Sequence, residues 1–153
     1  MRALSENPGL RPMLTPGGIT TKDDWETPPA FFAELDAEFG FTLDACATAA
    51  TAKCGAFFTP ADDALLRSWD GVVWMNPPYG RQISAWVEKA FTEAVRGATV
   101  VCLLPARTST AWWHDYCMRG EVRFIRGRLK FVGAPSAAPF PSAVVIFRPG
   151  AGA

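Results

Sequence analysis

Residues 72–80 read VVWMNPPYG and give the clearest indication of the fold. The first four residues are apolar, which is typical of a central strand buried on both faces of a parallel sheet. The strand is expected to end at the asparagine, because the two prolines that follow have no backbone N–H to donate to a neighbouring strand. A stiff loop carrying polar groups therefore follows a buried strand.

The rest of the chain alternates apolar runs with segments of helical period. Further strands are predicted at 41–46, 99–104, 122–125 and 143–147, with another around 57–58. Helices are predicted from a cap at Thr27 to Gly40, over 83–95, from 110 to about 118, and as a short helix that opens at Asp62 or Asp63. This alternation predicts an α/β fold with a mostly parallel central sheet flanked by helices.

The length of 153 residues fits one domain. Residues 1–21 contain several prolines and glycines and are expected to form a flexible N-terminal segment, followed by a domain over 22–149 and a tail over 150–153. No apolar run approaches the roughly 18 residues that span a bilayer, and the N-terminus lacks the apolar core of a signal peptide. We therefore expect no membrane association and a cytoplasmic protein.

The net charge of zero excludes a protein whose whole surface binds phosphate, yet the charges are unevenly placed. Residues 1–100 carry 8 basic and 13 acidic side chains, whereas residues 101–153 carry 7 basic and 2 acidic ones. The basic side chains Arg107, Arg126, Arg128 and Lys130 are candidates for phosphate contacts, which predicts an anionic partner. The alternative is a solvated face whose arginines balance acids elsewhere in the chain.

The four cysteines are scattered, and we expect reduced thiols in the core. A zinc site needs closely spaced pairs of ligands. His114 and Cys117 have such a spacing but no second pair, so no metal is assigned.

The Asn76-Pro77-Pro78-Tyr79 segment suits chemistry on a planar amino group. Asn76 and the Pro77 carbonyl supply two rigidly held acceptors, and an exocyclic –NH2 has two protons to donate. Accepting both protons frees the nitrogen lone pair and stabilises the positive charge that develops there during transfer. Tyr79 adds a flat ring that suits stacking on a base. The alternative is a simple turn, since Asn and Pro are common turn residues.

Three predicted strand ends carry notable residues: Asp44, Asn76 and the Pro105-Ala106-Arg107 run. Ligands of parallel α/β sheets bind outside the carboxyl ends of the strands. In this position, residues 76–79 resemble the catalytic motif of S-adenosylmethionine-dependent amino-group methyltransferases. The wider pattern is similar to the phage-type DNA N-6-adenine methyltransferases (Dam family). The matching pieces are Asp24–Pro29, Leu43–Ala47, Asn76–Gly80, Leu104–Thr108 and Gly127–Phe131.

The resemblance implies a minimal Rossmann-like methyltransferase fold and transfer of a methyl group from S-adenosylmethionine to the N6 of a flipped-out adenine in DNA. It places Trp25, Thr27 and Pro28 against the methionine end of the cofactor, and Asp44, with Ala45 and Cys46, near its amino or ribose groups. It makes Asn76, Pro77, Pro78 and Tyr79 the catalytic residues that hold the target base. It also implies a bacterial or phage-infected cell and DNA methylation, with restriction–modification as a setting.

Two features of the predicted cofactor site need comment: the composition of the loop after Asp44, and the part played by Asp62 or Asp63. The loop at residues 47–51 has none of the glycines that many methyltransferases use for close backbone approach. Asp62 or Asp63 could reach the cofactor's adenine, and the alternative is capping of a helix beside Pro60.

Flipping of a base out of the duplex needs supporting contacts. Trp112, Trp113 and Phe131 could support it, and the alternative for the two tryptophans is that one lies in the core and the other at the surface.

Two other functions stay open at this point. The same tetrapeptide fits a cytosine N4, an RNA base or a protein glutamine amide. The missing loop glycines would also fit an inactive remnant that binds DNA. No sequence feature indicates an oligomeric state or a separate target-recognition segment.

Overall fold

The computed structural model describes residues 23–151. The predicted flexible segment 1–21 and the end of the predicted tail lie outside the described residues. The α-helices are α1 (Pro29–Phe39), α2 (Ile83–Val95) and α3 (Ala111–Asp115), and the 3-10 helices are η1 (Pro60–Asp62), η2 (Ala64–Leu66) and η3 (Cys117–Arg119). The strands are β1 (Leu43–Asp44), β2 (Val72–Met75), β3 (Thr99–Pro105), β4 (Glu121–Phe124) and β5 (Ser142–Phe147).

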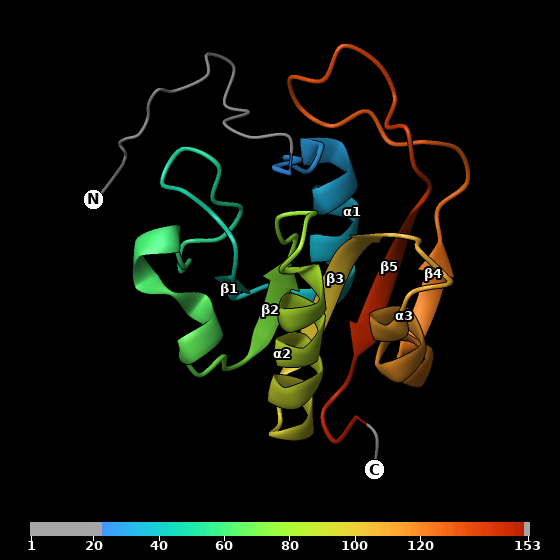
Figure 1. Cartoon of the computed structure of the whole chain (residues 1–153). Coiled ribbons are helices and arrows are strands. Elements are labelled where there is room, and N and C mark those ends of the chain that lie inside the picture. Colours follow the sequence, from blue (N-terminus) through green and yellow to red (C-terminus); the bar gives the residue numbers. More distant parts are fainter. Residues whose placement is uncertain (1–22, 152–153) are drawn as a thin grey trace.

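The strands form one sheet in the order β1-β2-β3-β5-β4. Helix α1 lies on one face of this sheet, and α2 and α3 lie on the other (Figure 1). The α/β class and the helices on both faces are therefore confirmed. Within residues 23–151, no helix has the length and apolar character to cross a membrane.

The expectation of a mostly parallel sheet is wrong. β1, β2 and β3 are parallel, but β5 runs antiparallel to both β3 and β4. The antiparallel β3–β5 pairing spans six residue pairs, against four for the parallel β2–β3 pairing. The reason is the connection between β4 and β5, which contains no helix. Parallel neighbours need a crossover, usually helical, so β5 returns directly beside β4 in the opposite direction.

The predicted strand at 41–46 shortens to two residues. Asp44 pairs through its backbone with both Ala56 and Phe58, so the segment predicted as a strand at 57–58 contributes one isolated bridge. The chain then turns because the Asp44 carboxylate accepts the N–H of Cys46. β1 is therefore a short edge strand that ends in a turn.

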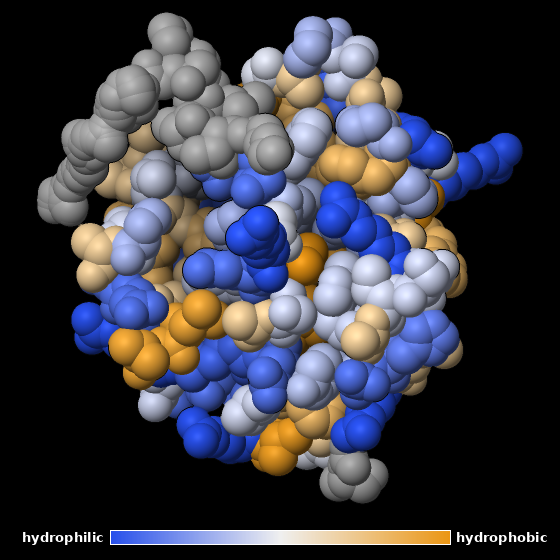
Figure 2. Space-filling model, viewed as in Figure 1, coloured by the Kyte–Doolittle hydropathy of each residue, from blue (hydrophilic) through white to orange (hydrophobic). Residues whose placement is uncertain are grey.

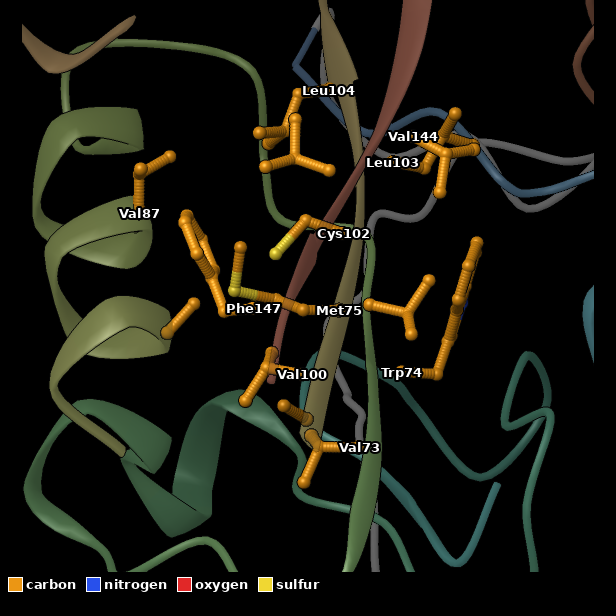
Figure 3. Packing of buried hydrophobic residues seen from close by; sticks show 14 of the residues in the cluster. Val73, Trp74, Met75, Val87, Val100, Cys102, Leu103, Leu104, Val144 and Phe147 are labelled. Carbon is orange, nitrogen blue, oxygen red and sulfur yellow. The ribbon is translucent and has the colours of Figure 1, made fainter. Parts of the chain in front are cut away.

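The core lies on both faces of β2, as Figure 3 shows. Trp74 points away from α2 and packs edge-on against Phe32 of α1 at 5.4 Å. Met75 points toward α2, where Val87 and Phe147 are fully buried. The burial of β2 on both faces confirms the reading of the apolar run.

Glu93 is a buried acid that joins α2 to the segment before β2. It is 2% exposed, and its Oε1 accepts the Trp69 N–H at 2.8 Å. Its Oε2 accepts from Lys89 Nζ at 2.9 Å and from Arg96 Nη1 at 3.2 Å. Burial opposes ionisation, but the hydrogen bonds from Trp69 and Lys89 outweigh it, and the pKa of Glu93 lies below its usual value.

We predict that Glu93→Gln lowers the free energy of unfolding by about 1.5–3 kcal/mol at pH 7, because hydrogen bonds to a charged acceptor contribute that much. A depressed pKa stabilises the folded state above the unfolded-state value and ceases to do so as the pH falls through the folded-state value. The difference between variant and wild type should therefore shrink toward pH 3 in denaturant titrations. Equal unfolding midpoints at pH 7 would contradict this role.

Candidate active site at the carboxyl ends of the strands

The parallel strands β1, β2 and β3 end at the same edge of the sheet, the upper edge in Figure 1. This arrangement brings Asp44, Asn76 and the loop that starts at Ala106 to one side of the molecule, as the sequence predicted. In Figure 2, hydrophilic side chains surround a hollow with an apolar floor above α2 on this side. The carboxyl edge of the sheet is thus the candidate site.

Residues 23–27, which we call the entry segment, cross the end of β2 before α1 begins. The Asn76 Nδ2 donates to the Trp25 carbonyl at 2.5 Å and to Thr27 Oγ1 at 3.0 Å. The Tyr79 N–H donates to the Asp23 carbonyl at 2.8 Å. Thr27 is therefore not the helix cap that was predicted, because its hydroxyl is used by Asn76 and the cap position falls to Pro28.

Two acceptors remain free beside the entry segment. The Asn76 Oδ1 is buried and has no hydrogen-bond partner. Among the described residues no backbone N–H donates to the Pro77 carbonyl. A buried unpaired acceptor costs about 1–3 kcal/mol, so its presence in a native site calls for a ligand that donates to it. The unpaired Asn76 Oδ1 is compatible with the predicted contact to an amino group, and the joint action of Asn76 and Pro77 stays a prediction.

Gly80 closes the motif and leaves room for the entry segment. A Cβ at this position would lie 2.5 Å from the Asp23 Oδ2. Residues 23, 78, 80, 81 and 82 line an open pocket of about 430 Å³. Arg81 and Gln82 are exposed there and were missed from the sequence, although they directly follow the motif.

Tyr79 forms part of the wall of the site. It is 4% exposed, its hydroxyl donates to the Leu103 carbonyl at 2.8 Å, and burial holds its pKa well above the usual value. Its ring meets Phe131 and Phe140 edge-on. A base reaches this ring only if the loop carrying Phe131 and Phe140 moves, so stacking on Tyr79 stays a prediction.

The long loop 125–141 folds back over the entry segment. Phe131 and Phe140 pack edge-on against Trp25 at 5.3 and 5.2 Å. The Val132 N–H donates to the Glu26 carbonyl at 3.0 Å. The half-buried Trp25 therefore lies between Asn76 and this loop.

Trp112, Trp113 and Phe131 do not present surfaces to DNA. They are 7%, 2% and 1% exposed. Both tryptophans are buried on α3, and Trp113 packs against Phe124 of β4, so the alternative that one of them faces solvent is wrong as well. The suggestion that they support a flipped base is wrong for this conformation.

Asp44 organises the loop that follows β1. It is 2% exposed, and its two oxygens accept the N–H groups of Cys46 at 3.2 Å and Lys53 at 3.0 Å. Burial raises the pKa of Asp44 to about 6, although these hydrogen bonds oppose the rise. Lys53 Nζ in turn pairs with Glu26 Oε2 at 3.1 Å. The loop that contains Ala45 and Cys46 is thereby tied to the entry segment.

The absence of glycines at 47–51 causes no backbone strain. Among the described residues, Asp63 is the one non-glycine residue with a positive φ, so the whole loop stays in ordinary conformations. Thr48 and Thr51 close it by accepting each other's backbone N–H groups. The loop therefore folds without glycines, and how closely a cofactor approaches its backbone stays a prediction.

Asp62 caps a 3-10 helix, whereas Asp63 does not. The Asp62 carboxylate accepts the Thr59 N–H and hydroxyl in a capping box at the start of η1, which confirms the capping alternative for this residue. Asp63 is exposed at a φ of 54° and makes no side-chain cap. Its contact with a cofactor stays a prediction.

The predicted phosphate-binding residues Arg107, Arg126, Arg128 and Lys130 are all exposed. Arg128 also donates to the Ala138 carbonyl at 3.4 Å across the 125–141 loop. Arg123 is not free to bind a phosphate, because its guanidinium donates to Glu38 and Glu121. Part of the basic excess is thus neutralised within the fold, whereas Arg107 and the basic residues of the 125–141 loop have no acidic partner among the described residues.

All four cysteines are free thiols, as expected, but only Cys102 and Cys117 lie in the core, and Cys46 and Cys54 are half-buried. Within residues 23–151, no three His, Cys, Asp or Glu side chains come close enough together to hold a metal ion. The site therefore rests on amide, carbonyl, carboxylate and aromatic groups.

Comparison with known proteins decides the family. The DNA N-6-adenine-methyltransferase (Dam) family model matches residues 18–149. The chain belongs to this family. It is 34% identical over 140 residues to the DNA N-6-adenine-methyltransferase of Haemophilus phage HP1, with 84% of this chain and 80% of the relative covered.

A second relative is the DNA N-6-adenine-methyltransferase of Escherichia phage T1, which is 35% identical over 104 residues. That match covers 66% of this chain and 42% of the relative, so the chain spans less than half the length of that enzyme. A putative methyltransferase YfdM of Escherichia coli K12 is 37% identical over 65 residues, 37% of this chain and 71% of the relative. The phage-type family predicted from the sequence is confirmed, and with it the class of enzyme.

The raised pKa of Asp44 predicts a pH-dependent stability. Between the unfolded value of 3.8 and the folded value of about 6, the folded protein binds the extra proton, so stability falls as the pH rises. Relative to Asp44→Asn, wild type should lose about 3 kcal/mol of unfolding free energy from pH 3.5 to pH 7, at 1.36 kcal/mol per pH unit. Denaturant titrations of both proteins measure this difference. A constant difference across the range would show that Asp44 titrates normally.

Proposed function

We propose that this Dam-family protein transfers a methyl group from S-adenosylmethionine to the N6 of an adenine flipped out of DNA. The observation that carries the proposal is the buried, unpartnered Asn76 Oδ1 beside the free Pro77 carbonyl. These two oxygens would accept the two amino protons of adenine. The proposed fold is a Rossmann-like methyltransferase core in a small form, with β5 and β4 as the antiparallel part of its sheet.

The residues present fit the cofactor. An aromatic side chain such as Trp25 attracts a sulfonium cation, and the buried Asp44 carboxylate retains lone pairs for amino or hydroxyl donors. Ala45 and Cys46 follow Asp44 in the loop tied to the entry segment, while Thr27 and Pro28 line that segment's end. When bound, S-adenosylmethionine supplies a methyl group activated by its positively charged sulfur.

Asn76 and Pro77 would act on the adenine amino group electrostatically. The amino nitrogen is a weak nucleophile because its lone pair is delocalised into the ring. Hydrogen bonds from both protons to these oxygens favour a tetrahedral nitrogen and stabilise the positive charge that develops on it. Neither oxygen is a strong base, so the proton leaves to water after the transfer.

DNA would lie across the same edge of the sheet. A base within a duplex is out of reach of the site, so it must leave the stack at a cost of a few kcal/mol. Arg107, Arg126, Arg128 and Lys130 are exposed on this side and would hold the phosphates that flank the flipped nucleotide. Pro78 and Tyr79 stiffen the loop that receives the base.

Asn76→Ala should lower the kcat for methylation of unmethylated DNA by about 100-fold or more, because one preorganised polar contact to developing charge is worth that much. Thr27→Val is the matched control, since it removes one acceptor of the Asn76 amide and leaves the free oxygen in place. Its loss should be smaller, about 10-fold, through poorer positioning. The assay uses S-adenosylmethionine with a labelled methyl group and mass spectrometry of the nucleosides. N6-methyladenosine at wild-type rates in Asn76→Ala, or label in cytosine or protein alone, would contradict the proposal.

Arg126→Ala should weaken DNA binding and reduce the slope of log affinity against log salt by about 1, because one phosphate contact and its released counterion are lost. Arg126 is a cleaner test than Arg128, which also braces the loop through Ala138. Arg123→Ala is the control, because this arginine is committed to Glu38 and Glu121. An unchanged salt slope in Arg126→Ala would remove this residue from the DNA-binding surface.

A further inference from the structure

Phe124 is an exposed aromatic residue at the end of β4 with no role in the site described so far. It is 68% exposed, whereas the other aromatic side chains near β4 are buried or half-buried. Its ring stacks on Trp113, with centroids 6.3 Å apart and an interplanar angle of 22°. Trp113 is 2% exposed in α3, so Phe124 rests on a rigid support with its outer side toward solvent.

The strand order places Phe124 at the functional edge of the sheet. β4 and β3 are both antiparallel to β5, so β4 ends at the same edge as β3 and β2. Phe124 is in register with Ala143, which is in register with Leu104 near the end of β3. Three strand spacings of about 4.8 Å separate β4 from β2, which puts Phe124 about 15 Å across the edge from Asn76.

The surroundings of Phe124 are basic. No acidic residue occurs between positions 122 and 147. Arg126, Arg128 and Lys130 follow Phe124 directly and are exposed, and strongly hydrophilic side chains project from the region of this loop at the upper right of Figure 2. An exposed aromatic ring among unpaired cations is the combination that binds the bases and phosphates of a nucleic acid strand.

We propose that Phe124, supported by Trp113, stacks on a nucleotide base of the DNA that flanks the target adenine. This inference rests on the proposed function and extends it from phosphate contacts to a base contact. A distance of about 15 Å corresponds to roughly four steps of 3.4 Å along a stacked strand, so the base lies about four nucleotides from the target and is not the target itself. Like the target, it must leave the duplex stack to meet the ring. Stacking on an aromatic ring is tolerant of sequence, so Phe124 contributes affinity without reading a base.

The charge around Phe124 argues for DNA over a second copy of the chain. β4 is an edge strand, and an exposed apolar residue on such a strand also suits self-association. Two copies that met through β4 would bring their Arg126, Arg128 and Lys130 side chains together, which is unfavourable. The negatively charged strand has the complementary sign.

Fluorescence anisotropy with a labelled unmethylated duplex tests the inference. Phe124→Ala should weaken binding about 5- to 150-fold, the range for loss of one stacked base, with no change in the salt slope because no charge is lost. Phe124→Trp should restore binding, whereas Phe124→Leu, which is apolar but cannot stack, should not. Met118→Ala is the matched control, since Met118 is also exposed, at 61%, and lies outside the basic loop.

Four results would overturn the inference. Phe124→Ala could bind within twofold of wild type, or Phe124→Leu could bind as well as Phe124→Trp. Sedimentation could show a wild-type dimer that Phe124→Ala dissociates without loss of DNA affinity, which would make the patch a self-association surface. Absence of DNA binding by the wild type would overturn this inference together with the proposed function.

Methylation measured in parallel separates the two claims. Wild-type activity that Asn76→Ala abolishes, combined with unaltered DNA binding by Phe124→Ala, would remove the stacking contact alone. Weaker binding by Phe124→Ala, combined with full activity of Asn76→Ala, would remove the proposed catalytic role alone.

Discussion

The hydrogen bonds from the Asn76 amide to the entry segment determine how the site is arranged. An asparagine side chain can turn either its oxygen or its nitrogen toward a ligand. Here the Trp25 carbonyl can only accept, so the Nδ2 is turned toward it and toward Thr27 Oγ1, and the buried Oδ1 is left without a partner. The two bonds, each worth about 0.5–1.5 kcal/mol, offset the cost of leaving the oxygen unpaired. The protein thus maintains a free acceptor where an amino group is expected.

That orientation depends on contacts that hold the entry segment in place. The Tyr79 N–H donates to the Asp23 carbonyl, and the Lys53–Glu26 ion pair links the entry segment to the loop after β1. Phe131 and Phe140 of the 125–141 loop pack against Trp25. Each partner follows a different strand of the sheet. β1, β2 and β4 all run in the same direction, which brings these loops to one edge, so the sheet and the site form one structural unit.

The sequence was enough to predict those parts of the fold and the motif that depend only on residues close together in the chain. The apolar run before Asn76 was enough to locate β2, and the helical spacing of Ile83, Val87 and Ala90 was enough to locate α2, because burial on these elements follows their periodicity. The antiparallel β5 was missed because a strand's direction leaves no mark on its composition; the signal that could have found it is the connection between 125 and 143, for which no helix is predicted.

The site was predicted less completely for the same reason. The role proposed for Asn76 and Pro77 follows from their own chemistry, but the part of Thr27 in holding Asn76 depends on a contact between residues 49 positions apart. Phe124 was missed because an aromatic residue in a strand is usually buried, and only the position of β4 at the sheet edge exposes it. For Trp112 and Trp113 the error was the reverse, because one of them was expected to face solvent. Adjacent helical positions usually face different environments, but here both side chains are buried.

The most direct measurement is a crystal structure of the protein with S-adenosylhomocysteine and a short DNA duplex that contains an unmethylated adenine. The account predicts that the adenine N6 lies within hydrogen-bond distance, about 3.0 Å, of both the Asn76 Oδ1 and the Pro77 carbonyl, with the Asn76 amide still bound to Trp25 and Thr27. A complex in which the Asn76 amide turns its nitrogen toward the base, or in which the adenine amino group is held by other residues, would contradict it.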